Sequence, residues 1–257
     1  MKKSILILLC FCILRSFAQS VDSDCSIQNT FGLKGEKISY ELIYNWGLIW
    51  VEAGKVDFSV RDTLVNGKTC YKLRGYGTSY KNWDWFYKVR SNYESLTNDQ
   101  LRPIWFRRKG REGSHYYNTL YSIKGNEADF VSIDKKGKAT QLKISLADCS
   151  FDVISAIYYC RTIDFSKVQI NETIPLNLFL DGESHESYLR YLGKVKWKDE
   201  RSGKEYNCIK FSPLLIDGTV FKEGENMVVY VTDDGRKLPV YIETELVVGQ
   251  AKVFLIH

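Results

Sequence analysis

Short segments in which apolar and polar residues alternate follow one another along most of this chain. Between residues 54 and 60, for example, Val56, Phe58 and Val60 alternate with polar or charged residues. A period of two is the pattern of a β-strand that buries one face. Turn signals separate the segments, and Asn66-Gly67 is the clearest because this dipeptide favours a two-residue hairpin turn. The pattern predicts antiparallel β-structure, as in a sandwich or a barrel.

The composition agrees with this fold class. The 257 residues include 17 Tyr, 13 Phe and 6 Trp but only 2 Met and 4 Pro, which favours strands over helices. A chain with 44% hydrophobic and 26% charged residues is neither a disordered tail nor a multi-span membrane protein. The predicted strands span residues 37–44, 54–60, 69–74, 87–95, 103–108, 115–123, 128–133, 139–144, 173–180, 188–197, 206–211, 227–232, 239–245 and 247–256.

One segment departs from the alternation. Residues 152–161 place their apolar side chains at a spacing closer to that of a helix, and Ser150 or Asp152 can cap its start. We therefore expect one helix of about three turns in the middle of the chain. The predicted fold is all-β with this one short helix: an antiparallel barrel or a strongly curved sheet. A curved sheet with the helix at its mouth would form a concave cavity.

Two landmarks recur 136 residues apart, because Gly67 corresponds to Gly203 and Pro103 corresponds to Pro239. A duplicated β-meander would explain these matches, and chance is the alternative. Duplication predicts halves at residues 36–124 and 172–257, joined by a helical connector at residues 125–171. Without duplication, residues 19–257 form one exported β domain.

The N-terminus has the pattern of a secretory signal peptide. Lys2 and Lys3 precede an apolar run at residues 4–14, and Ser16 and Ala18 are the small residues before a cleavage point. This predicts a signal peptide at residues 1–18 that is cleaved after Ala18. Eleven apolar residues are too few for a membrane anchor, which needs about twenty. We therefore expect a soluble exported protein with no transmembrane span after cleavage.

Cleavage changes the charge and the cysteine count. The signal peptide carries three basic residues and no acids, so its removal reduces the net charge from +5 to +2. This small charge and the exported location argue against nucleic acid as a partner. An odd number of cysteines remains, which leaves at least one thiol without a partner in the same chain, and the pairing is left open. These cysteines are Cys25, Cys70, Cys149, Cys160 and Cys208.

Several motifs, distributed in order along the chain, resemble one protein family. They are residues 83–95, residues 152–161 with 164–166, the opening at 35–40 with Ala53-Gly54, and the ending at 230–234, 238–240 and Gly249. Together they resemble the exported bacterial family called domain of unknown function 3108, over nearly all of the mature chain. The resemblance implies an envelope protein of a Gram-negative bacterium, located in the periplasm or associated with the outer membrane. It brings no activity and no catalytic residues with it.

The ending contains a second, weaker similarity. Its strand, Asp turn, Leu-Pro and second strand resemble part of the periplasmic lipoprotein carriers, whose open β-barrels hold lipid.

Motifs of enzyme chemistry are incomplete in this sequence. Residues 66–69 lack the upstream glycine of a phosphate-binding loop, and Leu189 occupies the second histidine position of a zinc-protease helix that would start at His185. We expect His115 to lie on the surface at the start of a strand.

The acidic residues around His185 form a loop that could hold a cation, but a solvated loop explains them better. We therefore expect no metal and no cofactor. The residues considered for this cation site are Asp181, Glu183, His185 and Glu186.

Two clusters are candidates for ligand binding. Aromatic residues crowd residues 83–87, where they would stack on a sugar ring or line an apolar pocket, although we favour packing in the core or at an edge. Basic residues crowd residues 102–111, where an arginine suits a carboxylate, sulfate or phosphate, and a solvated hairpin is the alternative. On a strand, Arg107 and Arg108 face opposite sides, so only one of them can enter a cavity. The candidate ligand-binding residues are Trp83, Trp85, Tyr87, Arg90, Arg107, Arg108 and His115.

Three functions remain open from the sequence. The leading hypothesis is an exported, non-catalytic protein that binds or carries an amphipathic or anionic ligand, a lipid or a glycan. An enzyme that acts on polysaccharide is less favoured, because no spacing singles out a pair of catalytic carboxylates. A scaffold that presents sheet edges to envelope partners is the third. The carboxylates considered for the enzyme are Asp84, Glu94, Asp152 and Asp181.

Overall fold

The computed structural model describes residues 33–47, 49–216 and 223–256. The predicted signal peptide, its cleavage point after Ala18, and Cys25 lie outside the described residues. None of the helices in the described part is both long enough and apolar enough to cross a bilayer.

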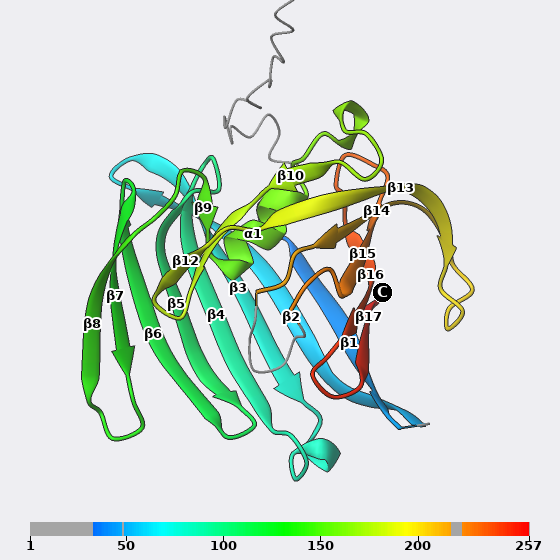
Figure 1. Ribbon diagram of the computed structural model, residues 1–257, viewed down its shortest axis with the longest axis horizontal. Helices are drawn as coiled ribbons and strands as arrows, with labels where there is room; N and C mark the ends of the chain where they lie inside the picture. Colours follow the sequence, from blue (N-terminus) through cyan, green and yellow to red (C-terminus); the bar gives the residue numbers. More distant parts are fainter. Residues whose placement is uncertain (1–32, 48, 217–222, 257) are drawn as a thin grey trace, which may run out of the picture.

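A single antiparallel sheet of 14 strands dominates the fold (Figure 1). Its order is β10-β13-β14-β15-β16-β17-β1-β2-β3-β4-β5-β6-β7-β8, so β10 and β8 are its two edges and the sheet does not close. Of the two predicted architectures, the strongly curved sheet is the one observed. Its strands are β1 (Lys37–Trp46), β2 (Ile49–Val65), β3 (Lys68–Ser79), β4 (Val89–Asn98), β5 (Pro103–Glu112), β6 (His115–Lys124), β7 (Glu127–Ile133), β8 (Ala139–Ser145), β10 (Thr173–Pro175), β13 (Tyr188–Lys198), β14 (Glu205–Pro213), β15 (Met227–Thr232), β16 (Pro239–Glu245) and β17 (Gln250–Ile256).

The first and last strands of the chain lie side by side in the middle of this sheet. Tyr40 of β1 is opposite Val56 of β2 on one side and Leu255 of β17 on the other. Register shifts between β1 and β2, between β4 and β5, between β13 and β14, and between β15 and β16 mark bulges or irregularities. A bulge bends a strand and increases its twist, which helps so wide a sheet to curve.

The predicted hairpin at Asn66-Gly67 is confirmed. Both residues have positive φ, 50° and 75°, as a type I′ turn requires, and β2 pairs with β3 up to Val65 and Lys68. The other long strands begin and end within four residues of their predicted positions, apart from β2, which extends five residues further at each end, and β3, which ends five residues later. Gly67 and Gly203, which are 136 residues apart, both lie in hairpin turns. The segment predicted as a helical connector, residues 125–171, contains β7 and β8 as well as the helix.

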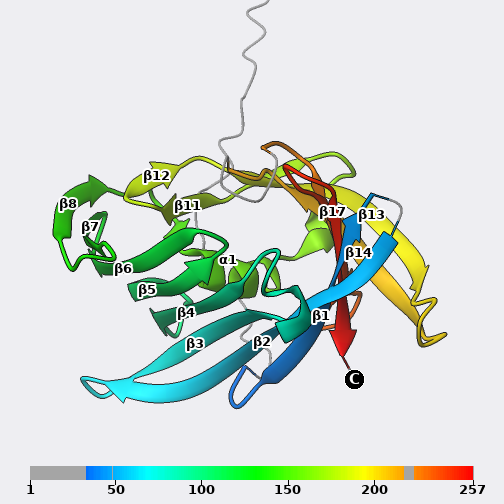
Figure 2. The same cartoon turned by 90° about the horizontal axis from the view of Figure 1, so that it is seen from below.

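The predicted helix is α1 (Val153–Cys160), and the large sheet curves around it (Figure 2). A small sheet of β9 (Ser150–Phe151), β11 (Asn177–Leu180) and β12 (Glu183–His185) contacts the helix and the large sheet. Two short 3-10 helices, η1 (Lys81–Trp83) and η2 (Phe165–Lys167), complete the described elements.

Gly75 in the middle of β3 allows α1 to approach the sheet closely. A Cβ at this position would lie 2.8 Å from Ile154 Cδ1 and 3.2 Å from Phe58 Cε1. A larger residue would therefore force the Ile154 side chain and the Phe58 ring to shift.

The predicted strand at residues 173–180 is wrong in one respect, because the chain divides it between two sheets. β10 pairs with β13 in the large sheet, whereas β11 pairs with β9 and β12 in the small one. Leu176 lies at the break, where its side chain is buried and its N–H donates to the Ser187 carbonyl. Ile174, Leu176 and Leu178 keep the period of two across the break and conceal it.

Helix α1 also joins two hydrophobic cores. Ile154 and Tyr158 belong to the core under β2 to β7, and Ala156 belongs to the core under β13 to β15. Tyr159 packs against both. The helix therefore connects the two arms of the sheet.

The sequence leaves at least one thiol without a partner in the same chain, and three cysteines of the described part are free. Cys70 and Cys208 are free and buried in strands, and Cys160 is free at the end of α1. Burial raises the pKa of the Cys160 thiol to about 12 and that of the Cys208 thiol to about 11, so neither forms a thiolate readily. Cys149 is disulfide-bonded.

Candidate functional site

Several turns meet at one end of the large sheet, which we call the aromatic end (the lower end in Figure 1). They include the turns that connect β1 to β2, β3 to β4, β5 to β6, β7 to β8 and β16 to β17. Antiparallel neighbours place alternate turns at opposite ends, so these turns share one end. All seven candidate ligand-binding residues lie here or on the strands that lead here.

The aromatic residues between β3 and β4 are not core residues. Trp85 is 71% exposed, Phe86 and Tyr87 are also exposed, and Trp83 is half-buried. The preferred interpretation, packing in the core or at an edge, is therefore wrong for Trp85. Pairing between β3 and β4 ends at Thr78 and Arg90. The connection between these strands therefore extends past the end of the sheet instead of packing against it.

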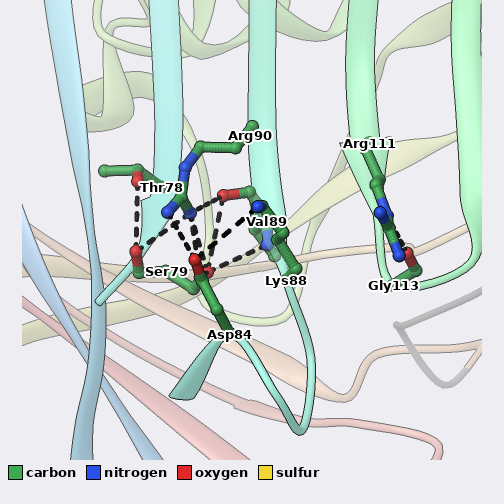
Figure 3. Close-up of polar contacts among 8 residues, drawn as sticks. All are labelled: Thr78, Ser79, Asp84, Lys88, Val89, Arg90, Arg111 and Gly113. Atoms are coloured by element: carbon green, nitrogen blue, oxygen red, sulfur yellow. Dashed lines mark hydrogen bonds and ion pairs between the residues drawn. The ribbon is translucent and has the colours of Figure 1, made fainter. Parts of the chain in front are cut away.

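Asp84 and Arg90 hold this connection in place (Figure 3). Asp84 Oδ2 lies 2.7 Å from Arg90 Nη2, and Asp84 Oδ1 accepts a 2.6 Å hydrogen bond from Ser79 Oγ. Arg90 also donates to the Ser79 carbonyl, and the Val89 N–H donates to Ser79 Oγ. The hydrogen bond from Ser79 and the nearby Arg90 lower the pKa of Asp84. Arg90 therefore positions the loop, and its charge is already paired.

Arg108 lies on the inner side of β5 and is only 6% exposed. Its guanidinium carbon is 3.4 Å from the centre of the Tyr117 ring and 5.3 Å from that of Tyr93. Its Nη1 is 3.2 Å from Asp181 Oδ1, and its Nη2 is 3.2 Å from Glu112 Oε2. Arg107 is exposed on the other face. The prediction that only one of these arginines faces inward is confirmed.

One donor of this arginine has no partner. Arg108 Nε is the one buried side-chain nitrogen or oxygen in the described part of the chain that makes no hydrogen bond. A buried donor without a partner costs about 1–3 kcal/mol, so a ligand oxygen that reached it would recover that cost. We call Arg108, Glu112, Asp181, Tyr93 and Tyr117 the Arg108 site.

Glu112 connects the Arg108 site to its neighbours. Its Oε1 accepts hydrogen bonds from Ser91 Oγ at 2.8 Å and from the Tyr93 hydroxyl at 2.9 Å. The sequence analysis missed this residue. The period of two could have found it, because Arg108 and Glu112 are four residues apart on one strand and face the same side.

Tyr87 and His115 border the site. Gly113 has φ of +59°, and a Cβ there would lie 2.5 Å from Tyr87 Cε2, so glycine lets the tyrosine ring lie against the β5–β6 turn. Burial raises the pKa of Tyr87. His115 is exposed at the start of β6, as expected, and stacks on Tyr117 with ring centres 6.4 Å apart. The structure thus brings Tyr87, Arg108 and His115 to one region.

The carboxylates considered for an enzyme are engaged separately. Asp84 pairs with Arg90, Glu94 lies 3.5 Å from Lys72, and Asp181 pairs with Arg108. Asp152 is fully buried and caps α1 by accepting from the Ile154 and Ser155 N–H groups. Burial raises its pKa, against the hydrogen bonds that favour its charged form. These four carboxylates do not form a pair around an open cleft, as glycoside hydrolysis would need.

The acidic loop considered for a cation forms the β11–β12 hairpin. No three His, Cys, Asp or Glu side chains among the described residues are grouped so that they could hold a metal ion. Asp181 instead turns toward Arg108, and the Tyr121 hydroxyl accepts from the Gly182 N–H at 2.7 Å.

Two depressions in the described part of the chain lie away from the Arg108 site. One of about 270 Å³ is lined by Glu41, Arg201 and Leu255, and one of about 250 Å³ is lined by Trp50, Glu243 and Lys252. Both are open to solvent.

Comparison with known proteins identifies a family and a fold. Residues 39–256 match the family described as "Protein of unknown function (DUF3108)". A crystal structure described as a beta-barrel-like protein of domain of unknown function DUF1849 from Brucella abortus is similar, with a TM-score of 0.53 and 9% identity. The similarity covers 87% of this chain and 96% of the other, and at this identity it shows the fold alone. No curated protein matches the sequence significantly.

Proposed function

Because the chain belongs to the DUF3108 family, which is described only as having unknown function, we propose its function from its own site. The protein is an exported, non-catalytic binding protein of the bacterial envelope. Its ligand is amphipathic and carries an acidic group, as an anionic lipid or an acidic glycan does. The acidic group binds at Arg108, and the apolar part or sugar ring lies against the neighbouring aromatic residues.

The unpartnered Nε of Arg108 carries this proposal. Guanidinium groups bind carboxylate, sulfate and phosphate through two parallel hydrogen bonds. Arg108 holds Glu112 through Nη2, while Nη1 pairs with Asp181, whose side chain is 58% exposed. An incoming acid that displaced Asp181 would gain Nη1 without unfolding the strand, and an acid oxygen that reached Nε would share the Nε–Nη2 side of the guanidinium with Glu112.

The tyrosines around Arg108 supply the second half of the recognition. Tyr93 and Tyr117 contact the guanidinium by their faces, and His115 extends the aromatic surface toward solvent. Aromatic faces stack on sugar rings and cover apolar chains. This combination suits a ligand that has an acidic group beside a ring or an alkyl chain.

A thermal-shift assay with paired variants tests the proposal. The panel contains uronic acids, sulfated sugars and phospholipid headgroups, and the proteins are the parent, Arg108→Gln and Arg107→Gln. Arg107 is the matched control because it is the adjacent residue on the opposite face. We expect one class of anion to stabilise the parent and Arg107→Gln, and binding by Arg108→Gln to weaken by about 1.5–3 kcal/mol. The proposal fails if no anion stabilises the parent or if both variants respond as the parent does.

A further inference from the structure

Three turns at the aromatic end expose large apolar side chains together. They are the β1–β2 turn, the β3–β4 connection and the β16–β17 turn. Val248 and Trp85 are the most exposed of the set, each at 71%. We call this set the apolar rim: Ile49, Trp50, Trp85, Phe86, Val247 and Val248.

Tyr44 connects these turns into one surface. Its ring centre is 6.3 Å from that of Phe86, and its hydroxyl donates to the Val248 carbonyl at 3.1 Å. Phe86 in turn contacts Trp85, with ring centres 6.0 Å apart. Asn45 is opposite both Trp50 and Gln250, so the β1–β2 and β16–β17 turns are neighbours. The rim is therefore continuous across the end of the sheet.

Exposed apolar side chains at loop tips are costly in water, and grouped ones mark an interaction surface. The Asp84–Arg90 ion pair and the Ser79 hydrogen bonds hold Trp85 and Phe86 outward in a fixed loop. A loop held outward in this way gives up little conformational entropy when it binds.

The charges beside the rim favour an anionic partner. Segments 80–90, 109–115 and 134–138 lie at the aromatic end and contain eight basic and three acidic residues, a local charge of +5. Lys135 Nζ donates to the Ser114 carbonyl, which places the β7–β8 turn beside the β5–β6 turn. Glu243 and Glu245 lie on the other side, so the positive charge is concentrated around β3 to β8.

We propose that the apolar rim inserts into the interface of an anionic phospholipid bilayer. Tryptophan and phenylalanine at loop tips with flanking lysines are the side chains that favour the headgroup region of a bilayer. Lysines and arginines near an anionic surface each contribute about 1 kcal/mol to binding. This inference goes beyond the Arg108 site, because the rim uses different residues and either can fail alone.

Vesicle flotation tests the inference. The probes are phosphatidylcholine vesicles and equimolar phosphatidylcholine–phosphatidylglycerol vesicles. We expect the parent to float with the anionic vesicles and much less with the neutral ones. The double variant Trp85→Ser/Phe86→Ser should bind at least tenfold more weakly, because each side chain loses its burial in the interface.

Leu64→Ser is the matched control. Leu64 is 72% exposed near the β2–β3 turn, which lies at the opposite end of the sheet. This variant should float as the parent does, and a loss equal to that of the double variant would overturn the assignment to the rim. Failure of the parent to bind either vesicle, or unchanged binding by the double variant, would also overturn it. Arg108→Gln should still float, which separates this result from a failure of the ligand site.

Discussion

Two regions of this protein each bury an arginine, and they differ in how fully that arginine is bonded. At the end of α1, Arg161 pairs with Glu36 through both terminal nitrogens, at 2.7 and 2.8 Å, and its Nε donates to the Arg236 carbonyl. In the Arg108 site, the two carboxylate contacts are 3.2 Å long and Nε has no partner. The first arginine is fully satisfied, and the second is not.

This difference teaches how to separate a structural charge from a functional one. A buried guanidinium that gains every hydrogen bond from its own chain has nothing left for a ligand. Such an arginine stabilises the fold. Arg161, for example, connects α1 to the start of β1 and to the β15–β16 turn. One with a free donor and an exposed partner retains binding capacity and is the better candidate for function.

Arg161→Ala should have the largest effect on stability. It leaves the buried Glu36 without its counter-ion, so we expect the free energy of unfolding to fall by about 3–5 kcal/mol in urea titrations. Lys34→Ala is the control, because Lys34 and Asp62 form an ion pair at the surface and its loss should leave the midpoint almost unchanged. A loss for Arg161→Ala as small as that of the control would remove the distinction.

Asp181→Asn should affect binding more than stability. Because the Asp181 side chain of the Arg108–Asp181 pair is exposed, loss of this pair should lower the free energy of unfolding by only about 0.5–1 kcal/mol. The variant should bind the anionic ligand more tightly than the parent does, because Arg108 no longer has to release a carboxylate. Isothermal titration measures the affinity, and Glu183→Gln on the same hairpin is the control. Weaker binding by Asp181→Asn would contradict the displacement of Asp181.

Asp84→Asn should remove the pH dependence of the stability that the β3–β4 connection contributes. The pKa of Asp84 is lowered in the folded protein, so its contribution is present above its ordinary pKa and is lost as the pH falls through the lowered value. The parent should therefore be more stable than the variant at neutral pH, and the two should converge in acid. Melting curves recorded across the acid range check this, and a gap that widens in acid would contradict it.

Trp85→Ala should have the smallest effect on stability. The side chain is exposed on a loop, so we expect a change within about 0.5 kcal/mol. Phe106→Ala is the contrast, because Phe106 is fully buried in the core under β2 to β7. Its loss should lower the free energy of unfolding by about 3–5 kcal/mol. A large loss for Trp85→Ala would show that the aromatic loop supports the fold and would weaken the proposed rim.

The sequence predicted most of the fold because its signals are local. Alternation located the long strands, Asn66-Gly67 located a hairpin, and Ser150 and Asp152 marked the start of α1, where Asp152 is the cap. The short strands β9 and β12 were missed, because two or three residues are too few to show a period. The break at Leu176 was missed because apolar residues keep the period of two on both sides of it.

The site was predicted only in part because its partners come from distant segments. Alternation separated Arg107 from Arg108, but nothing local indicated that Arg108 would meet Asp181, which is 73 residues away. Density of aromatic residues suggested a core at residues 83–87, and the structure places Trp85 outside it. A composition signal cannot tell a buried cluster from an exposed one, because the sheet that would cover it is formed by other segments.

The most direct test of the account is an NMR measurement of the arginine side chains. In a ¹⁵N-labelled protein, the Nε–H signals of Arg108 and Arg107 are assigned by comparison with Arg108→Lys and Arg107→Lys, and the anion panel is then titrated. The account predicts that one class of anion shifts the Arg108 signal strongly and leaves that of Arg107 in place. An Arg108 signal that stays unchanged with every anion, or that moves no more than the signal of Arg107, would contradict it.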